Sequence, residues 1–455
     1  MVFAGLMLGM FVASLSQTIV GPAMPRIVAE LGGMEHYSWI ATAAMLVSAV
    51  AVPVVGKLSD LYGRRWFYLG GIAVFMLGSV LAGVATDFWF LVFARAVQGL
   101  GMGTLLPLSQ TIIGDIIPPR QRGKYQGLMG AVFGVTSIAG PLIGGVITDH
   151  LGWRYLFFLT LPVGIIAFAF IHRHLHLDHT GRRGSLDWLG MATLTPGLVI
   201  ALLATSWGGN TYAWGSATII AMYAIAAVLL LGFVLAELRA QDPLLPLGLL
   251  ARPVVALSVT ASFAIAVAMF GAIIYIPVYA QGVLGVSATN SGAILIPLSV
   301  AMIGMSILSG LLISRIGRYK GILITGGVVL LAGYVLLTGV SYGDSAWHLT
   351  LAMVVIGMGL GLSMQVYTLV VQNAVAQKDL GIATASIQFF RNVGSTVGVA
   401  VLGTVMASQM GPAIAAHLPA QAQGAISVEG AGDATASVLD PSALAGLPAG
   451  IVEGI

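Results

Sequence analysis

The sequence predicts an all-helical protein that crosses a membrane many times. Of its 455 residues, 58% are hydrophobic and only 8% are charged, whereas soluble globular proteins carry about 25% charged residues. The mean hydropathy is +0.99. The apolar residues also gather in runs of about 20 residues, the length that a helix needs to cross a bilayer. This composition excludes an ordinary cytosolic enzyme and a disordered chain, and the absence of Cys excludes a disulfide scaffold.

Thirteen apolar runs are long enough to be membrane-spanning helices. They are continuous and lack the two-residue alternation of barrel strands. The 60 Gly residues allow close approach between membrane helices. The predicted spans cover residues 2–24, 37–55, 67–86, 88–113, 124–147, 153–171, 187–206, 213–236, 254–281, 288–313, 320–340, 346–374 and 379–408.

The distribution of Lys and Arg predicts a cytoplasmic N-terminus. With that orientation, fifteen of the 19 basic residues lie on the cytoplasmic side, and only Arg26 and Arg154 lie outside. Arg95 and Arg391 fall within spans. Short cytoplasmic loops are enriched in Lys and Arg, so the opposite orientation is disfavoured.

The two ends of the chain are abrupt. Met1 lies almost inside the first span, and residues 410–455 form a tail rich in Ala, Gly and Pro after the thirteenth. We expect a chain trimmed at both ends that lacks a fourteenth helix. The alternative is a natural thirteen-span protein with an external C-terminus.

An internal repeat predicts two parallel halves. Gly56–Arg65 follows the second span and Gly310–Arg318 follows the tenth, with Gly56 and Gly310 254 residues apart. Gly140 and Gly394 match at the same offset. The offset exceeds the length of six helices, which leaves room for two extra helices between the halves. The predicted divisions are a six-helix half at 1–172, a linker with the two extra helices at 173–252, a C-terminal half with five helices at 253–408 and an extracytoplasmic loop or tail at 409–455.

Three motifs carry the functional interpretation. In the loop Gly56–Arg65, Gly56 and Gly63 permit a tight turn and close helix approach, and Asp60 can pair with an Arg or with a helix N-terminus across the interface. The second copy has Ser314 in place of Asp60. The alternative interpretation is a basic loop with no moving part.

The second and third motifs lie inside spans. Arg95 is followed by Gln98 and Gly99 in the fourth span, and a charge at such depth is costly and usually functional. It could instead snorkel or pair only structurally. In the fifth span, Gly140 and Pro141 allow bending and close packing, which suits an occluding element, although a plain packing face has the same pattern.

These motifs resemble those of the major facilitator superfamily. The Gly56–Arg65 loop is similar to its signature loop between helices two and three, Arg95–Gly99 to its helix-four motif, and Gly134–Gly145 to a fifth-helix motif associated with antiporters. The extra helix pair, with Ser14–Pro25 and Arg391–Gly394, resembles the fourteen-helix drug:proton antiporters of EmrB/QacA type. The resemblance implies two six-helix halves plus two central helices, with the last helix absent here.

The same resemblance implies a function. It predicts a secondary exporter of lipophilic and amphiphilic compounds in a bacterial inner membrane, driven by proton antiport with alternating access. The implied partners are lipophilic small molecules, protons and membrane lipids, and a monomer is sufficient. No cofactor, metal or nucleic acid is expected. The alternatives are a transporter of lipids or lipid-like metabolites on the same fold and a non-transporting membrane sensor or scaffold.

The chain departs from the family pattern in the first helix. Many members carry an Asp at the position of Ser16, whereas this chain has Ser16 followed by Gln17. Almost all Asp and Glu residues of the chain lie in loops or at span ends. We therefore hypothesise that Arg95 with Asp115 carries the coupling. The proton-coupling and gating candidates are Arg95, Asp115, Asp60, Arg64, Gly140 and Pro141.

Polar and aromatic side chains within spans are the candidates for the substrate path. Their mixture predicts a large apolar cavity with uncharged hydrogen-bonding groups. The candidates are Ser16, Gln17, Gln98, Gln110, Phe263, Phe270, Tyr275, Tyr279, Gln365, Tyr367, Gln388 and Arg391. No phosphate-binding loop or hydrolase motif occurs in the sequence, which favours a transporter over an enzyme.

Overall fold

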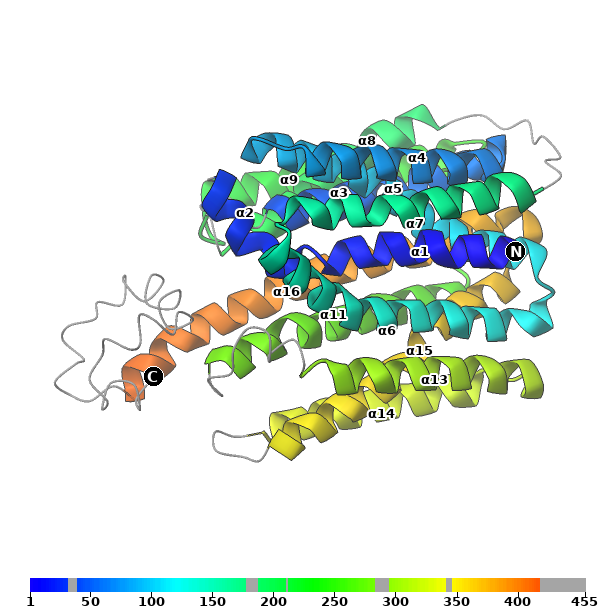
Figure 1. The fold of residues 1–455 in the computed structure, drawn as a ribbon. Coiled ribbons are helices and arrows are strands. Elements are labelled where there is room, and N and C mark those ends of the chain that lie inside the picture. Colours follow the sequence, from blue (N-terminus) through cyan, green and yellow to red (C-terminus); the bar gives the residue numbers. More distant parts are fainter. Residues whose placement is uncertain (32–38, 177–186, 210–211, 283–293, 341–345, 418–455) are drawn as a thin grey trace.

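Long helices run side by side along one direction of the molecule (Figure 1). The computed structural model describes residues 1–31, 39–176, 187–209, 212–282, 294–340 and 346–417. Within these ranges the regular elements are helices. The predicted all-helical fold class is confirmed.

The first helix group consists of seven α-helices and a short 3-10 turn. The helix α6 packs against α1 and, at the other side, against helices late in the chain. The bounds are α1 Val2–Thr18, η1 Gly21–Ala23, α2 Met24–Leu31, α3 Trp39–Tyr62, α4 Arg64–Gly83, α5 Phe88–Ile116, α6 Pro119–His150 and α7 Arg154–His174.

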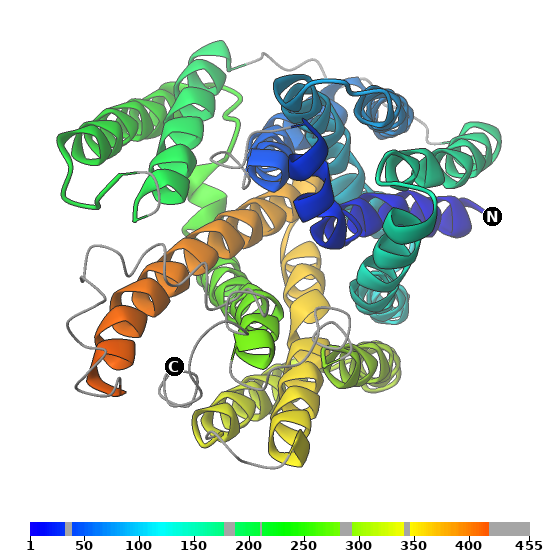
Figure 2. The same ribbon diagram turned by 60° about the vertical axis from the view of Figure 1, so that its left-hand side comes forward.

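Two further long helices follow, α8 (Trp188–Trp207) and α9 (Ala217–Arg239). They pack on each other, and α8 also packs against α3 and the last helix, α16. Figure 2 shows the pair at the edge of the bundle. The outer helix α9 exposes apolar side chains such as Val228, Leu231 and Leu238.

The second helix group completes the bundle. It is joined to the first group mainly by α6 against α13 and by α16 against α3. The bounds are α10 Leu247–Leu250, α11 Pro253–Gly282, α13 Ile296–Ile316, α14 Lys320–Thr338, α15 Ala346–Ala374, η3 Gln377–Asp379 and α16 Leu380–His417.

Twelve helices of the described chain are long and apolar enough to cross a membrane. They correspond to the first twelve predicted spans. The thirteenth predicted span, 379–408, lies within the 38-residue helix α16, which is not among the twelve. The count of thirteen therefore stays a prediction, and the fourteen-helix type is not confirmed.

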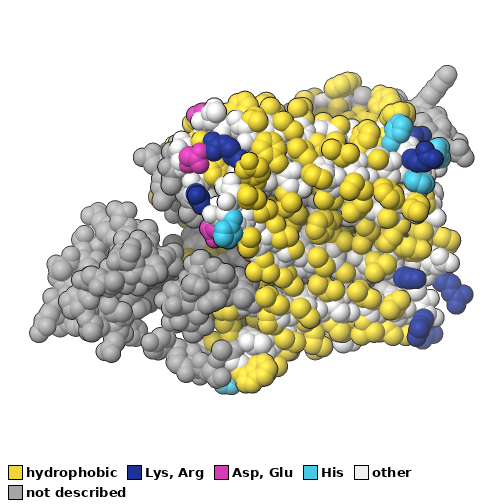
Figure 3. All heavy atoms as spheres, in the orientation of Figure 1, with side chains coloured by type: hydrophobic (Ala, Val, Ile, Leu, Met, Phe, Trp, Pro, Cys, Tyr) yellow, Lys and Arg dark blue, Asp and Glu magenta, His cyan; other side chains and the backbone are white. Residues whose placement is uncertain are grey.

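The surface agrees with a membrane location. In Figure 3 a broad hydrophobic band separates two ends at which the charged side chains gather. We call the end at which α3, α5 and α9 finish the basic end, because it carries residues such as Arg64, Arg122 and Arg239. The protein is a multi-pass membrane protein.

Several helix boundaries differ from the prediction for identifiable reasons. The motif Gly56–Tyr62 is not a loop but the last turns of α3, and the chain turns only at Gly63, which has a φ of 101°. Residues 288–293 of the span predicted at 288–313 lie outside the described residues. Within the described part, α13 begins at Ile296, with Pro297 in its first turn, where proline is well tolerated. The predicted tail is helical as far as His417, and its remainder lies outside the described residues.

The repeat of the sequence corresponds to a repeat of the contacts between the groups. A Cβ added at Gly56 would lie 2.6 Å from the Ala385 Cβ of α16, and one added at Gly310 would collide with the Gly123 carbonyl oxygen of α6. Gly317, the counterpart of Gly63, ends α13 with a φ of 72°. Each group therefore places one glycine of its motif against a helix of the other group.

Candidate functional site

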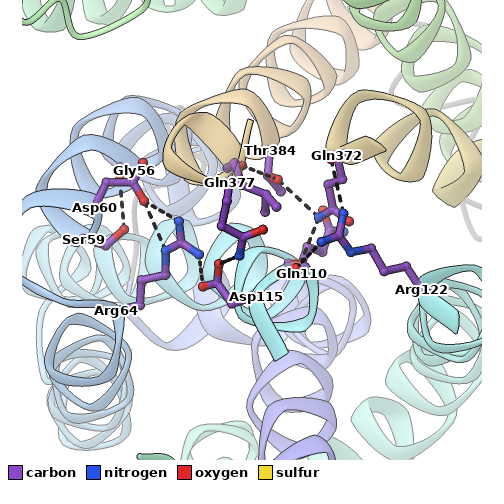
Figure 4. Close-up of polar contacts among 12 residues, drawn as sticks. Gly56, Ser59, Asp60, Arg64, Gln110, Asp115, Arg122, Gln372, Gln377 and Thr384 are labelled. Carbon is purple, nitrogen blue, oxygen red and sulfur yellow. Dashed lines mark hydrogen bonds and ion pairs between the residues drawn. The ribbon is translucent and has the colours of Figure 1, made fainter. Parts of the chain in front are cut away.

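Three charged side chains of the first helix group meet at the basic end. Asp60 lies in the last turn of α3, Arg64 in the first turn of α4 and Asp115 in the last turn of α5. The Arg64 Nη2 donates to Asp60 Oδ1 at 2.7 Å, its Nε donates to the same oxygen at 3.1 Å, and its Nη1 donates to Asp115 Oδ2. Only 11% of each side chain of the Asp60–Arg64 pair is exposed. The sharp turn at Gly63 places Arg64 beside Asp60. Figure 4 shows the side chains of Asp60, Arg64 and Asp115 together.

The same carboxylates contact the second helix group. Gln377 Nε2 donates to Asp115 Oδ1 at 2.8 Å, and the backbone N–H of Ile382, in the first turn of α16, donates to Asp60. A Cβ at Gly381 would collide with the Asp60 carboxylate, so glycine permits this approach. A negative charge is stabilised at a helix N-terminus. Asp60 thus makes both kinds of contact that the sequence allowed, to an arginine and to a helix N-terminus.

The repeat counterpart of Asp60 makes a weaker contact of the same kind. Ser314 Oγ, near the end of α13, accepts the backbone N–H of Lys124 in α6 at 2.9 Å. Both motifs therefore bind a backbone N–H of the opposite group near the basic end. Only the first motif does so with a charge.

A seam of buried glutamines continues the contact toward the middle of the membrane. Gln372 of α15 accepts from Gln126 Nε2 at 3.1 Å, and its own Nε2 donates to the Gln110 carbonyl at 2.9 Å and to Thr384 Oγ1 at 3.2 Å. Deeper in, Gln110 Nε2 donates to Gln365 Oε1 at 3.3 Å. Figure 4 shows Gln110, Gln372 and Thr384 between helices of the two groups.

Arg122 strengthens this seam from α6. Its Nη2 donates to the Gly114 carbonyl at 2.5 Å, and its Nη1 donates to the Gln372 carbonyl at 3.3 Å and to Asn373 Oδ1 at 3.2 Å. The arginine is only 5% exposed. The hydrogen bonds that join the two groups thus lie between the basic end and the middle of the helices.

Arg95 is held entirely within the first group by neutral acceptors. Its guanidinium donates to the Ile40 carbonyl at 3.1 Å, to Ser16 Oγ at 3.2 Å and to Gln98 Oε1. Gln98 in turn donates to Ser79 Oγ at 2.8 Å. Ser16 of α1 is therefore a hydrogen-bond partner of the buried arginine.

The structure does not bring Arg95 and Asp115 together. They are twenty positions apart in the single helix α5, which is about 30 Å at 1.5 Å per residue. Asp115 pairs instead with Arg64 and Gln377. The hypothesis that Arg95 and Asp115 together carry the coupling therefore involves no direct contact between them in this conformation, and it stays a prediction.

Helix α6 changes its partner along its length. Gly123, Gly127 and Gly130 pack against α13, whereas a Cβ at Gly140 would collide with Thr18 of α1. Pro141 lies inside α6 just after this change. The segment around Gly140 and Pro141 is therefore a packing face within the first group in this conformation.

Arg391 is the buried arginine of the second group. Its Nη2 donates to the Met364 carbonyl at 3.0 Å and to Thr368 Oγ1 at 3.4 Å, and its Nη1 donates to Gln388 Oε1 at 3.4 Å. Only 4% of the residue is exposed. The sequence candidates Gln388 and Arg391 are thus in contact.

Comparison with known proteins places the chain in a family. Residues 6–399 match the family model of the Major Facilitator Superfamily. The chain belongs to the major facilitator superfamily. It is 39% identical to the "Multidrug transporter protein MdtP" of Bacillus subtilis, over 99% of this chain and 85% of that protein. It is 40% identical to an uncharacterized MFS-type transporter of Mycobacterium tuberculosis, over 89% of this chain and 59% of that protein's length.

A solved structure supports the same fold. The human organic anion transporter MFSD10 (TETRAN) superposes with a TM-score of 0.67, at 17% sequence identity, over 89% of this chain and 93% of that chain. This likeness concerns the fold alone. The membership of the major facilitator superfamily makes the protein a membrane transporter and not an enzyme.

The remaining substrate candidates of this facilitator are dispersed. Tyr275 donates to the Val399 carbonyl at 2.5 Å, and Phe263 packs against Gly394, so both face α16. Phe270 and Tyr367 pack in the apolar core of the second group. Tyr279 has a buried hydroxyl for which no partner is recorded, and Gln17 is half-buried.

Sequence reasoning missed several residues of the contact between the groups. Gln126 and Gln372 satisfy the criterion that selected Gln110 and Gln365, since each is a glutamine inside a predicted span. Gln377 lies in the short turn η3 and Gly381 in the first turn of α16, and neither carries a local sequence signal for this contact. Their role follows only from the approach of α16 to Asp60 and Asp115.

The end of the facilitator opposite the basic end has its own ion pair. Arg154 donates to Glu30 Oε1, and Trp153 Nε1 donates to Glu30 Oε2 at 2.8 Å. These two hydrogen bonds, the one from Arg154 first, lower the pKa of the Glu30 carboxyl below its ordinary value. The pair ties α2 to the start of α7 within the first helix group.

Proposed function

We propose that this facilitator exports lipophilic and amphiphilic compounds across a bacterial plasma membrane, by proton antiport with alternating access. The observation that carries the proposal is the polar contact between the two helix groups at the basic end, centred on Asp60, Arg64, Asp115 and Gln377. Hydrogen bonds and ion pairs of this kind can be broken and remade as the groups separate, as alternating access requires. The relative named a multidrug transporter supports the class of cargo.

The orientation follows from the charges. Cytoplasmic loops carry the excess of Lys and Arg, so we place the basic end and the N-terminus in the cytoplasm. The conformation described here is then closed toward the cytoplasm. In this proposal the facilitator is of the fourteen-helix type, works as a monomer, and meets membrane lipid on the exposed apolar face of α9.

Asp60 and Asp115 are the proton acceptors of the proposed cycle. Asp60 contacts the N-terminus of α16 and Asp115 contacts Gln377, so both carboxylates join the two helix groups, while Arg64 holds the two carboxylates together within the first group. Protonation removes the charge that these contacts stabilise, which loosens the basic end and favours opening toward the cytoplasm. Arg95 is the interior coupling residue, since it is a buried charge that contacts the first-helix Ser16.

The glutamine seam supplies hydrogen-bonding groups for uncharged parts of the cargo. Gln110 Oε1 and Gln365 Nε2 are buried and have no recorded partner. Buried polar atoms without partners are costly, so they favour a ligand that offers a donor and an acceptor. We assign this role to Gln110 and Gln365 once the groups separate.

The test is export of a cationic and a neutral fluorescent dye from cells that lack their own pumps, with and without a protonophore. We expect export by the wild type that stops with the protonophore, and loss of uphill export in Asp115→Asn and Arg95→Ala. Full uphill export by both variants would overturn the assignment of these residues. Export that ignores the protonophore would overturn proton antiport, and no export of either dye by cells that contain the protein would overturn drug export in favour of lipid transport.

A further inference from the structure

Among the residues that the structure describes, three arginines are almost fully buried, and no carboxylate of these residues pairs with them. Arg95, Arg122 and Arg391 are 2%, 5% and 4% exposed, and the hydrogen-bond partners recorded for them are carbonyls, amides and hydroxyls. By contrast, Arg64 and Arg154 form ion pairs with carboxylates near the ends of the helices. The described interior of the protein is therefore positively charged.

The carboxylates of the described spans cannot offset this charge. Asp60, Asp115 and Glu237 lie within a turn of the basic end of their helices, and Asp149 lies in the last turn of α6 at the opposite end. The first helix has no acid, and Ser16 stands beside Arg95. An unpaired charge buried at membrane depth is costly, so such sites usually serve a partner of opposite charge.

Of the three arginines, Arg391 is held most loosely and lies deepest. Arg122 is anchored by the Gly114 carbonyl at 2.5 Å, and Arg95 has three partners within 3.2 Å. Two of the three hydrogen bonds of Arg391 measure 3.4 Å. Arg391 follows the start of α16 by eleven positions, or about 16 Å along the helix, roughly half of a hydrocarbon core of about 30 Å.

The location of Arg391 makes it accessible when the groups separate. Helix α16, which carries Arg391, packs against α3 and α5 of the first group. Met364 and Thr368, which accept hydrogen bonds from Arg391, lie on α15, which packs against α6. Separation of the groups uncovers these inner helices. A guanidinium offers a planar set of donors that matches a carboxylate, sulfonate or phosphate.

We propose that Arg391 binds an anionic group of the cargo, and that the preferred cargo is an amphiphile with a negative charge. The proposal rests on the export function proposed above and names its substrate class. An anion replaces the long hydrogen bonds to Gln388 and Thr368 with charge-assisted ones. A cationic compound of the same size meets an unpaired positive charge and binds more weakly.

The experiment measures equilibrium binding of two dyes to the purified full chain by fluorescence anisotropy. Carboxyfluorescein is an anion and rhodamine 123 a cation, and both share a xanthene ring. We expect the wild type to bind carboxyfluorescein more tightly. Arg391→Gln should weaken carboxyfluorescein binding about tenfold or more, the order expected for one charge-assisted hydrogen bond, without weakening rhodamine 123 binding. Arg391→Lys, which keeps the charge, should retain most of the affinity.

A matched control separates this role from a general loss of positive charge. Arg154→Gln also removes one arginine, at the opposite end and away from α16, and should leave the ratio of the two affinities unchanged. Equal carboxyfluorescein affinity in wild type and Arg391→Gln would overturn the proposal. If Arg391→Gln does not fold, tighter binding of rhodamine 123 than of carboxyfluorescein by the wild type would overturn it.

Dye export distinguishes this inference from the proposed function. A wild type that exports rhodamine 123 and neutral Nile red, but neither binds nor exports carboxyfluorescein, would refute the substrate class and leave the export function standing. A wild type that exports none of the three dyes would refute the export function and this inference with it.

Discussion

The substitution Asp60→Asn tests how much the charge of one carboxylate contributes to closure of the basic end. Asparagine keeps the shape and an oxygen acceptor, so the N–H of Ile382 retains a partner, but the charge that faces the N-terminus of α16 is lost. The bonds to Arg64 lie within the first helix group and survive opening. The expected loss is therefore the difference between one charge-assisted and one neutral hydrogen bond across the interface, about 1–2 kcal/mol. This corresponds to roughly a 5- to 30-fold shift toward the open state.

The shift can be measured with two spin labels, because the chain contains no Cys that would have to be removed. Gln121→Cys in α6 and Ile316→Cys in α13 are exposed positions of the two groups at the basic end. We expect a longer distance to gain population in Asp60→Asn. Ser314→Ala is the matched control, since it removes a neutral hydrogen bond at the repeat position, and it should shift the distances less. Equal shifts in the two variants would refute the reasoning from charge.

Three further predictions concern stability. Gly127→Ala places a Cβ 2.5 Å from the Ser306 carbonyl oxygen and should lower the Tm through about 1–3 kcal/mol of overpacking, whereas Gly145→Ala in the same helix meets open space and should leave it nearly unchanged. Gln372→Leu should cost about 1–3 kcal/mol, because it leaves the buried hydrogen-bonding groups of the seam without a partner, and unchanged thermal unfolding would contradict this. The lowered pKa of Glu30 means that its ion pair stabilises the fold above the ordinary carboxyl pKa of 4.5 and loses this contribution as the pH falls through the lower folded value. The Tm difference between wild type and Glu30→Gln should therefore be present at neutral pH and vanish on acidification, and a constant difference would show that Glu30 acts only by packing.

Most of the fold could be predicted from the sequence because membrane helices are recognisable by the length and hydropathy of their apolar runs. The predicted helix ends were wrong where a helix continues beyond its apolar run into charged or small residues. Gly56–Tyr62 was expected to be a loop because it contains charged residues and glycine. The helix α3 instead continues to Tyr62 and ends at Gly63, where φ becomes positive. Residues 410–417 were expected in a tail because Gly411 and Pro412 disfavour helix, yet α16 continues through them to His417.

The candidate site was predictable only in part. The motif residues Asp60 and Arg64 could be selected because their spacing recurs in the chain, and the structure shows them in contact. Ile382, which contacts Asp60, and Gln377, which contacts Asp115, could not be selected. Each lies more than 250 positions after its partner and meets it only through the packing of the two helix groups. The coupling role predicted for Arg95 and Asp115 needs an indirect connection, since about 30 Å of one helix separates them.

In the proposed function, a proton gradient drives export through reversible closure of the basic end. The most direct test reconstitutes the full chain in liposomes with a pH-sensitive dye inside, imposes a pH gradient and follows proton movement and uphill transport of a fluorescent amphiphile together. We expect coupled fluxes in the wild type and loss of both in Asp115→Asn when the same amount of protein is reconstituted. Uphill transport without proton movement, or proton movement that ignores the amphiphile, would contradict it.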